Sequence, residues 1–253
     1  TSGLTIADGN VNTSDGFSFD QRVAIVGTTI TGQTVDLNSL TLTGGGLSAA
    51  STNAVLTVTG TSNVDIDTLD ATGLASDLVI TGLDTGSAAA ITMGDTSNKI
   101  TIALADAARD AVDIDGGGGT DTVVFTEMAT GTYRPGLTNV EKLDVDTGDN
   151  TVQTAAITLH LGDAASVTTV ELDLDGGDED VTVAGASNVT SYLLGGAAAA
   201  TSDVVTLGSS STLTITNEAA LGGTDLNLVT PDATTLTIKQ GHSSATDFHT
   251  ITA

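Results

Sequence analysis

Short runs in which apolar residues alternate with threonine or aspartate recur from one end of the chain to the other. Clear examples span residues 100–104, 157–161, 170–174 and 236–238, and Gly, Asn, Asp or Ser separates successive runs. Alternation with a period of two is the pattern of a β-strand that buries one face. The runs begin about 8–23 residues apart, which is near the spacing typical of an all-β chain. The pattern therefore predicts an all-β protein.

Many short strands joined by glycine-rich turns are compatible with a sandwich, a barrel or a solenoid. The parallel β-helix or β-roll-like solenoid is favoured because the strands are short throughout and Asn, Asp and Gly recur where bends are needed. Aromatic residues make up 2% of the chain and Trp is absent, which suits a thin core filled by aliphatic side chains. Threonine, with 47 residues, favours strands, and stacked coils would align such residues in rows. A pair of β-sandwich domains is the alternative.

Residues 1–253 are expected to form a single elongated β domain. The chain begins at Thr1 without Met, so we expect it to be a fragment of a larger surface protein. A weak boundary is placed near 115–120, where glycine is dense. Two segments rich in helix formers, 103–111 and 197–200, are too short to be stable helices alone and are expected to decorate the β framework.

The net charge of the chain excludes several classes of binding partner. The chain has 32 Asp+Glu and 6 Lys+Arg, a formal net charge of −26, which excludes nucleic acid and anionic lipid as natural partners. No apolar run approaches the ~20 residues that span a bilayer, so direct membrane insertion is not expected. Cysteine is absent, which removes disulfides and thiolate metal sites.

The acids recur beside glycine at the ends of the β-like runs, for example at 112–121 and 172–180. Carboxylates crowded at strand ends repel one another unless a cation neutralises them, and basic side chains are few. A hard cation that prefers oxygen ligands would serve, and calcium is the first candidate.

The sharpest motif runs from Gly116 to Val124 and reads Gly-Gly-Gly-Gly-Thr-Asp-Thr-Val-Val. It fits the nonapeptide G-G-x-G-x-D-x-U-x that binds calcium in β-rolls. Glycines allow a tight turn whose carbonyls can serve as ligands, and the Asp adds a charged oxygen. The predicted metal-binding residues, from this motif and the second acidic segment, are Asp113, Asp115, Gly117, Gly119, Asp121, Asp173, Asp175, Asp178 and Asp180.

The segment Asp115–Phe125, followed by Leu137-Thr-Asn-Val-Glu-Lys-Leu143, resembles RTX-type secreted proteins and the calcium-dependent bacterial S-layer proteins. The resemblance covers about 30 residues. It implies a Ca²⁺ ion between the turns of successive coils, so that one isolated nonapeptide supplies half a site. The segments 175–180, 194–196 and 222–226 depart from the motif, so a tandem array is absent.

Catalytic motifs have little support in the sequence. No nucleophile elbow precedes a serine and no H-E-x-x-H occurs, so we expect no enzyme. The leading expectation is a secreted structural protein at the cell surface: a calcium-stabilised S-layer module that assembles with identical subunits and contacts cell-surface polysaccharide. The alternatives are a calcium-dependent adhesin or carbohydrate-binding module, with Tyr133 or Tyr192 exposed to a sugar, and an extracellular filament subunit in which Thr1–Phe19 donates a strand.

Overall fold

The computed structural model describes the chain in segments. These are residues 5–6, 11–13, 17–20, 28–31, 35–37, 40–44, 54–59, 64–66, 68–74, 78–81, 89–95, 97–103, 112–126, 131–146, 156–174, 180–196, 204–217, 226–240 and 248–252.

The predicted all-β class and parallel solenoid are confirmed, and the described segments contain strands and no helix. Every strand pair with a determined register is parallel, as in β10 (Leu78–Thr81) against β7 (Ala54–Thr59), which rules out the alternative sandwich because antiparallel sheets build sandwiches. Ala103 ends a strand, and the remainder of the two predicted helical segments, 104–111 and 197–200, lies outside the described residues. In the described part of the chain no helix has the length and hydrophobicity that a bilayer crossing needs.

Two compact units make up the chain: Thr1–Val124 with Gly136–Val140, and Phe125–Pro135 with Glu141–Ala253. Strand β14 (Thr122–Thr126) lies where the chain passes from the first unit to the second. The predicted weak boundary near 115–120 lies a few residues before this point.

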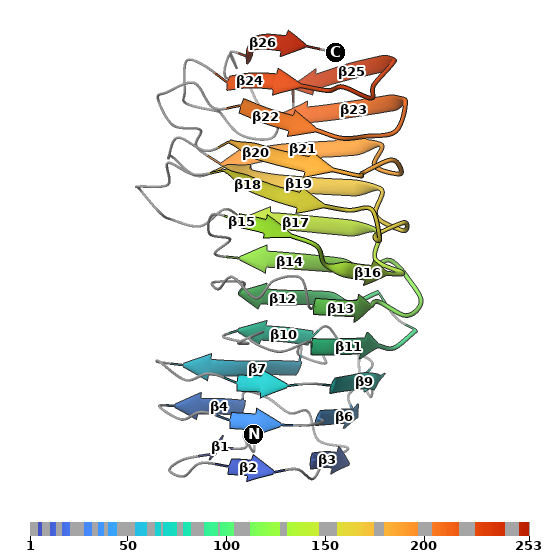
Figure 1. Cartoon of the computed structure of the whole chain (residues 1–253). Coiled ribbons are helices and arrows are strands. Elements are labelled where there is room, and N and C mark those ends of the chain that lie inside the picture. The colour runs from blue at the N-terminus through green and yellow to red at the C-terminus, as the bar shows by residue number, and fades with distance from the viewer. Residues whose placement is uncertain are drawn as a thin grey trace. The chain divides into compact units, whose positions relative to one another are not determined.

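In the first unit the chain coils through three sheets and then through two (Figure 1). The first sheet holds β1 (Thr5–Ile6), β4 (Thr28–Thr31), β7, β10 and β12 (Lys99–Ala103). The second holds β3 (Phe17–Asp20), β6 (Leu40–Gly44), β9 (Thr68–Leu74), β11 (Ala89–Met93), β13 (Val112–Asp115) and β16 (Gly136–Thr138). The third holds β2 (Val11–Thr13), β5 (Val35–Leu37) and β8 (Val64–Ile66).

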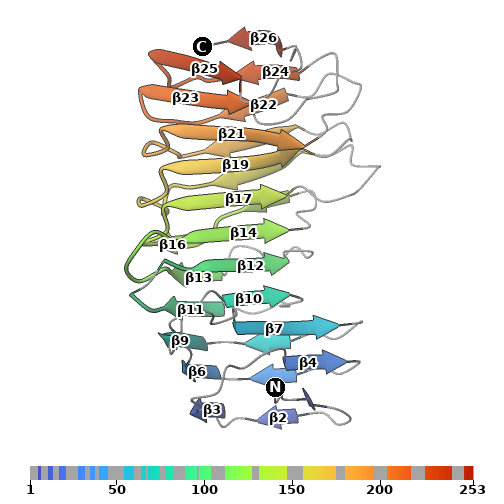
Figure 2. The same ribbon diagram turned by 180° about the vertical axis from the view of Figure 1, so that it is seen from behind.

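In the second unit successive strands alternate between two sheets, so each coil adds one strand to each (Figures 1 and 2). Five consecutive strands of an 11-stranded sheet, here called the charged sheet, are β17 (Lys142–Asp146), β19 (Thr169–Leu174), β21 (Ser191–Gly196), β23 (Thr212–Asn217) and β25 (Thr235–Gln240). The other, here the threonine sheet, contains β15 (Gly131–Tyr133), β18 (Ile157–His160), β20 (Val181–Ala184), β22 (Val204–Leu207), β24 (Leu226–Val229) and β26 (Phe248–Thr252).

The core of the second unit consists of rows of apolar side chains, one from each coil. In the charged sheet one row runs Leu143, Val170, Tyr192, Ile215 and Ile238. The first four side chains are 0% exposed and Ile238, on the last strand of the sheet, is 42% exposed. Each residue in a row is therefore covered by its neighbours in the adjoining coils, and the last coil lacks that cover.

Tyr192 is the one polar group in this row and its hydroxyl is satisfied. The hydroxyl donates a hydrogen bond of 2.6 Å to the carbonyl oxygen of Gly208. Burial, and secondarily the negative charge of Asp232, raise the pKa of Tyr192 well above its ordinary value, so the phenol stays protonated and remains a donor at every physiological pH.

A pair of leucines on β21 tests this assignment of faces. Leu194 is 0% exposed whereas its neighbour Leu193 is half-exposed on the outer side of the sheet. We expect Leu194→Ala to lower the free energy of unfolding by about 2–5 kcal/mol, because it leaves a cavity, and Leu193→Ala to cost at most about half as much. Urea unfolding followed by circular dichroism measures both, and equal losses would contradict the assignment.

Candidate functional site

The predicted calcium nonapeptide forms a corner of the first unit, between β13 and β14. The glycine run makes this corner: Gly117 and Gly119 have φ angles of 81° and 113°, which side-chain-bearing residues rarely adopt. A Cβ atom on Gly117 would also overlap the carbonyl oxygen of Gly94 in the preceding coil. The glycines are therefore required by backbone conformation and by the close approach of the neighbouring coil.

Asp121 anchors this corner to the preceding coil. Its side chain is 3% exposed, and its Oδ1 accepts hydrogen bonds from the backbone N and the Nδ2 of Asn98, at 2.8 and 3.2 Å. Asn98 Nδ2 also donates to the carbonyl oxygen of Gly94, and the backbone N of Thr122 donates to the carbonyl oxygen of Asn98. The Asp of the motif thus connects two coils through a buried asparagine.

Asp115 forms the corresponding connection to the following coil. Its Oδ1 accepts a 3.1 Å hydrogen bond from the backbone N of Gly117 and a 2.9 Å hydrogen bond from Nδ2 of Asn139. Asn139 has a φ of 53°, a left-handed conformation that asparagine tolerates better than most residues. The segment Leu137–Leu143, quoted above for its resemblance to S-layer proteins, includes this corner.

Asp113 lies exposed on the outer side of β13. Its register partner in the next coil is Gly136, and a Cβ atom on Gly136 would overlap the Asp113 carboxylate. In the second unit Asp173 and its register partner Gly195 repeat the arrangement. In both units an outward aspartate therefore occupies the space that the glycine of the next coil leaves empty.

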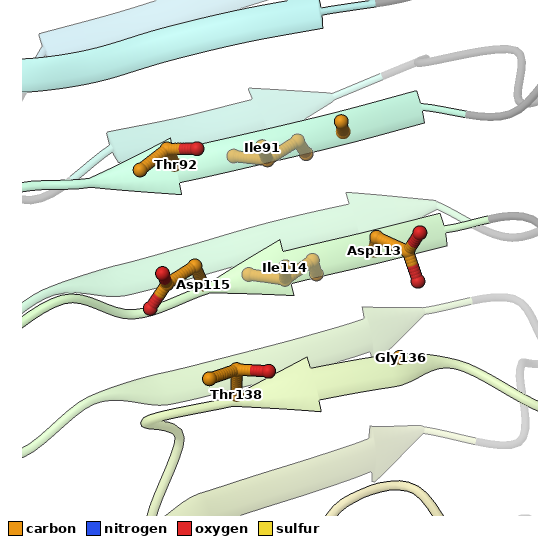
Figure 3. A pocket seen from close by; sticks show the side chains of 8 residues that line it. Ile91, Thr92, Asp113, Ile114, Asp115, Gly136 and Thr138 are labelled. Carbon is orange, nitrogen blue, oxygen red and sulfur yellow. The ribbon is translucent and has the colours of Figure 1, made fainter.

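A hollow of about 170 Å³ lies on this face of β11, β13 and β16 (Figure 3). Two register rows line it, Ala90–Asp113–Gly136 and Thr92–Asp115–Thr138. Its polar side chains supply carboxylate and hydroxyl oxygens, the ligand types that hard cations prefer.

The remaining predicted metal-binding residues lie apart from this corner in the sequence. Asp180 is exposed and its Oδ1 accepts a 3.1 Å hydrogen bond from the backbone N of Val204, while Asp173 is half-buried on β19. Asp175 and Asp178 lie outside the described residues. Within the described segments no three His, Cys, Asp or Glu residues are arranged to hold a metal ion, and Asp121 is buried while Asp113 is exposed.

Sequence reasoning missed Asn98 and Asn139, the two asparagines that pair with the motif aspartates. The available signal was spacing, because Asn98 lies 23 residues before Asp121 and Asn139 lies 24 residues after Asp115. Both separations correspond to one coil.

Comparison of the chain with protein-family models, with curated proteins and with solved structures finds no match in any of the three.

Two aspartates of the same segment, one buried and one exposed, test the anchoring role. Asp121→Ala removes the acceptor for two hydrogen bonds from buried Asn98, so we expect a loss of about 1–3 kcal/mol in the free energy of unfolding. The loss should be the same in EDTA and in calcium, and the control Asp113→Ala should change stability by less than ~0.5 kcal/mol in EDTA. Chemical unfolding of both variants in the two buffers measures this, and a loss for Asp121→Ala that occurs only in calcium would contradict the anchoring role.

Proposed function

We propose that this chain is a structural extracellular protein, a calcium-stabilised module of a self-assembling surface layer. The observation that carries the proposal is the register of acids on the charged sheet. Asp144 is the register partner of Glu171, and Asp146 is the register partner of Asp173, so two pairs of acidic residues lie at the strand spacing of ~4.8 Å. Lys142 forms an ion pair with Glu171, which leaves a surplus of negative charge along this pair of strands.

Parallel stacking cannot separate these acids without changing the core, because register fixes both faces of a strand together. A bound cation would relieve the repulsion between them. Calcium suits the task because it takes six to eight oxygen ligands in a flexible geometry. The accessible carboxylates of Asp113, Asp115, Asp173 and Asp180 are its proposed ligands in the described segments, and the same chemistry can connect neighbouring copies.

A structural role is favoured over an enzymatic or sugar-binding one. The hollow beside Asp113 is smaller than the ~300–1,000 Å³ of typical small-molecule sites. Tyr133 and Tyr192 are 1% and 0% exposed, so neither can stack on a sugar ring as a carbohydrate-binding module would need. The strands within Thr1–Phe19 already pair inside their own chain, as β1 with β4 and β2 with β5. We further propose that the protein is secreted to the cell surface and contacts polysaccharide there.

Calcium removal tests the proposal directly. We expect millimolar calcium to raise the melting temperature and to produce large ordered particles, and EGTA to reverse both, because the charge of −26 then opposes close packing. Differential scanning fluorimetry and dynamic light scattering follow the two quantities, and electron microscopy shows whether the particles are sheets. Magnesium at equal concentration controls for ionic strength, and its effect should be smaller because it demands octahedral geometry. If neither the melting temperature nor the particle size changes on adding calcium or EGTA, the proposal is contradicted.

A further inference from the structure

The outer side of the threonine sheet carries one row of nearly identical side chains. Register places one residue from each of the six strands in this row, and five of the six are threonine. The row, here called the threonine row, is Thr132, Thr158, Thr182, Thr206, Val229 and Thr252. Valine has the shape of threonine with a methyl in place of the hydroxyl, so the row keeps one outline along its whole length.

The threonine row is open to solvent and partly apolar. Its six side chains are half-exposed or exposed, and each presents at least one methyl group. Val204, on the same sheet beside the row, is 36% exposed and is one of two large hydrophobic side chains exposed within the described segments. β-Branched side chains are stiff at χ1, so ordering them in a contact costs little conformational entropy.

The strands of the threonine sheet also carry no formal charge. Its six strands contain no Asp, Glu, Lys or Arg. In the charged sheet of the same unit, β17 and β19 carry acids, and β17 and β25 carry lysine. Formal charges lie just beyond the strand ends, as at Arg134 after β15 and Asp180 before β20, and these two are of opposite sign.

We infer that the neutral face of the threonine sheet, centred on the threonine row, is a contact between two copies of this chain. The inference rests on the proposed self-assembly and identifies the surface through which two copies would associate. Two copies with a charge of −26 each repel wherever carboxylates meet within the Debye length of ~8 Å, and they approach at least cost where both faces are neutral. A basic partner would prefer the acidic surfaces instead, so charge selects a second copy for this face.

The dimensions of the face suit a weak contact. Six strands at ~4.8 Å, each of three to five residues at ~3.3 Å per residue, give a patch of at most about 25 by 16 Å. That is well below the ~800 Å² per partner of a stable dimer. A two-fold contact of this kind can repeat across a sheet of subunits, where many weak contacts act together.

Two threonines on opposite sheets supply a matched test. Thr206 lies in the threonine row and Thr216 lies on the outer side of β23 in the charged sheet, and both are half-exposed. Thr206→Glu and Thr216→Glu each add one negative charge. Sedimentation velocity of the full chain in millimolar calcium, over a range of concentrations, gives the dissociation constant for self-association. Thr206→Glu should raise it at least tenfold and Thr216→Glu less than twofold, whereas Thr206→Val should leave it unchanged, since valine already occupies the row at Val229.

The outcomes separate this inference from the proposed function. Self-association of the wild type that Thr206→Glu does not weaken would overturn the contact and leave the surface-layer proposal intact. A wild type that stays monomeric with and without calcium would overturn both. Melting temperatures within about 2 °C of the wild type show that the glutamate variants are folded. If Thr206→Glu does not fold, single-cysteine variants replace it as the test, because the chain has no cysteine of its own. In calcium, Thr182→Cys should form an intermolecular disulfide and Thr214→Cys should not. The reverse result would overturn the contact.

Discussion

Parallel pairing of coil upon coil in register is the interaction on which the rest of this structure depends. It stacks Leu143, Val170, Tyr192 and Ile215 into one covered row, so that each side chain is buried by its equivalents above and below. Because the side-chain period of a strand is two, a slip of one residue would exchange the inner and outer faces. The core, the outer rows and the corners are therefore fixed together, and no coil is stable without its neighbours.

The same register accounts for the unusual charge distribution. It sets acid against acid on β17 and β19, and it seats the Asp113 carboxylate over Gly136. It also aligns the threonine row, which keeps one face neutral. Under the proposed function, these acidic and neutral surfaces would allow assembly to begin only where calcium is present.

Much of the fold could be predicted from the sequence, because aliphatic–threonine alternation and corner glycines are local signals. The strands expected at 157–161, 170–174 and 236–238 correspond to β18, β19 and β25. The coil period was missed because its length varies: residues hydrogen-bonded between coils lie from 21 to 28 positions apart. The candidate site was less predictable, since a Gly-Asp motif does not reveal whether its Asp faces solvent or the interior. Asp121 is buried against Asn98, a contact between coils that only the register discloses. Calcium binding by the predicted residues stays a prediction.

The most direct test of this account measures the register between coils by disulfide trapping. Because the chain has no cysteine, two introduced cysteines can pair only with each other. Ser191 and Thr214 are register partners on β21 and β23, and facing residues on neighbouring strands fall within the ~4.4–6.8 Å between Cα atoms that a disulfide spans. The double variant Ser191→Cys/Thr214→Cys should close an intramolecular disulfide under mild oxidation, detected by mass spectrometry of the monomer. Ser191→Cys/Thr216→Cys, displaced by two positions on the same face, should stay reduced. Closure of the displaced pair in place of the facing pair would contradict the account.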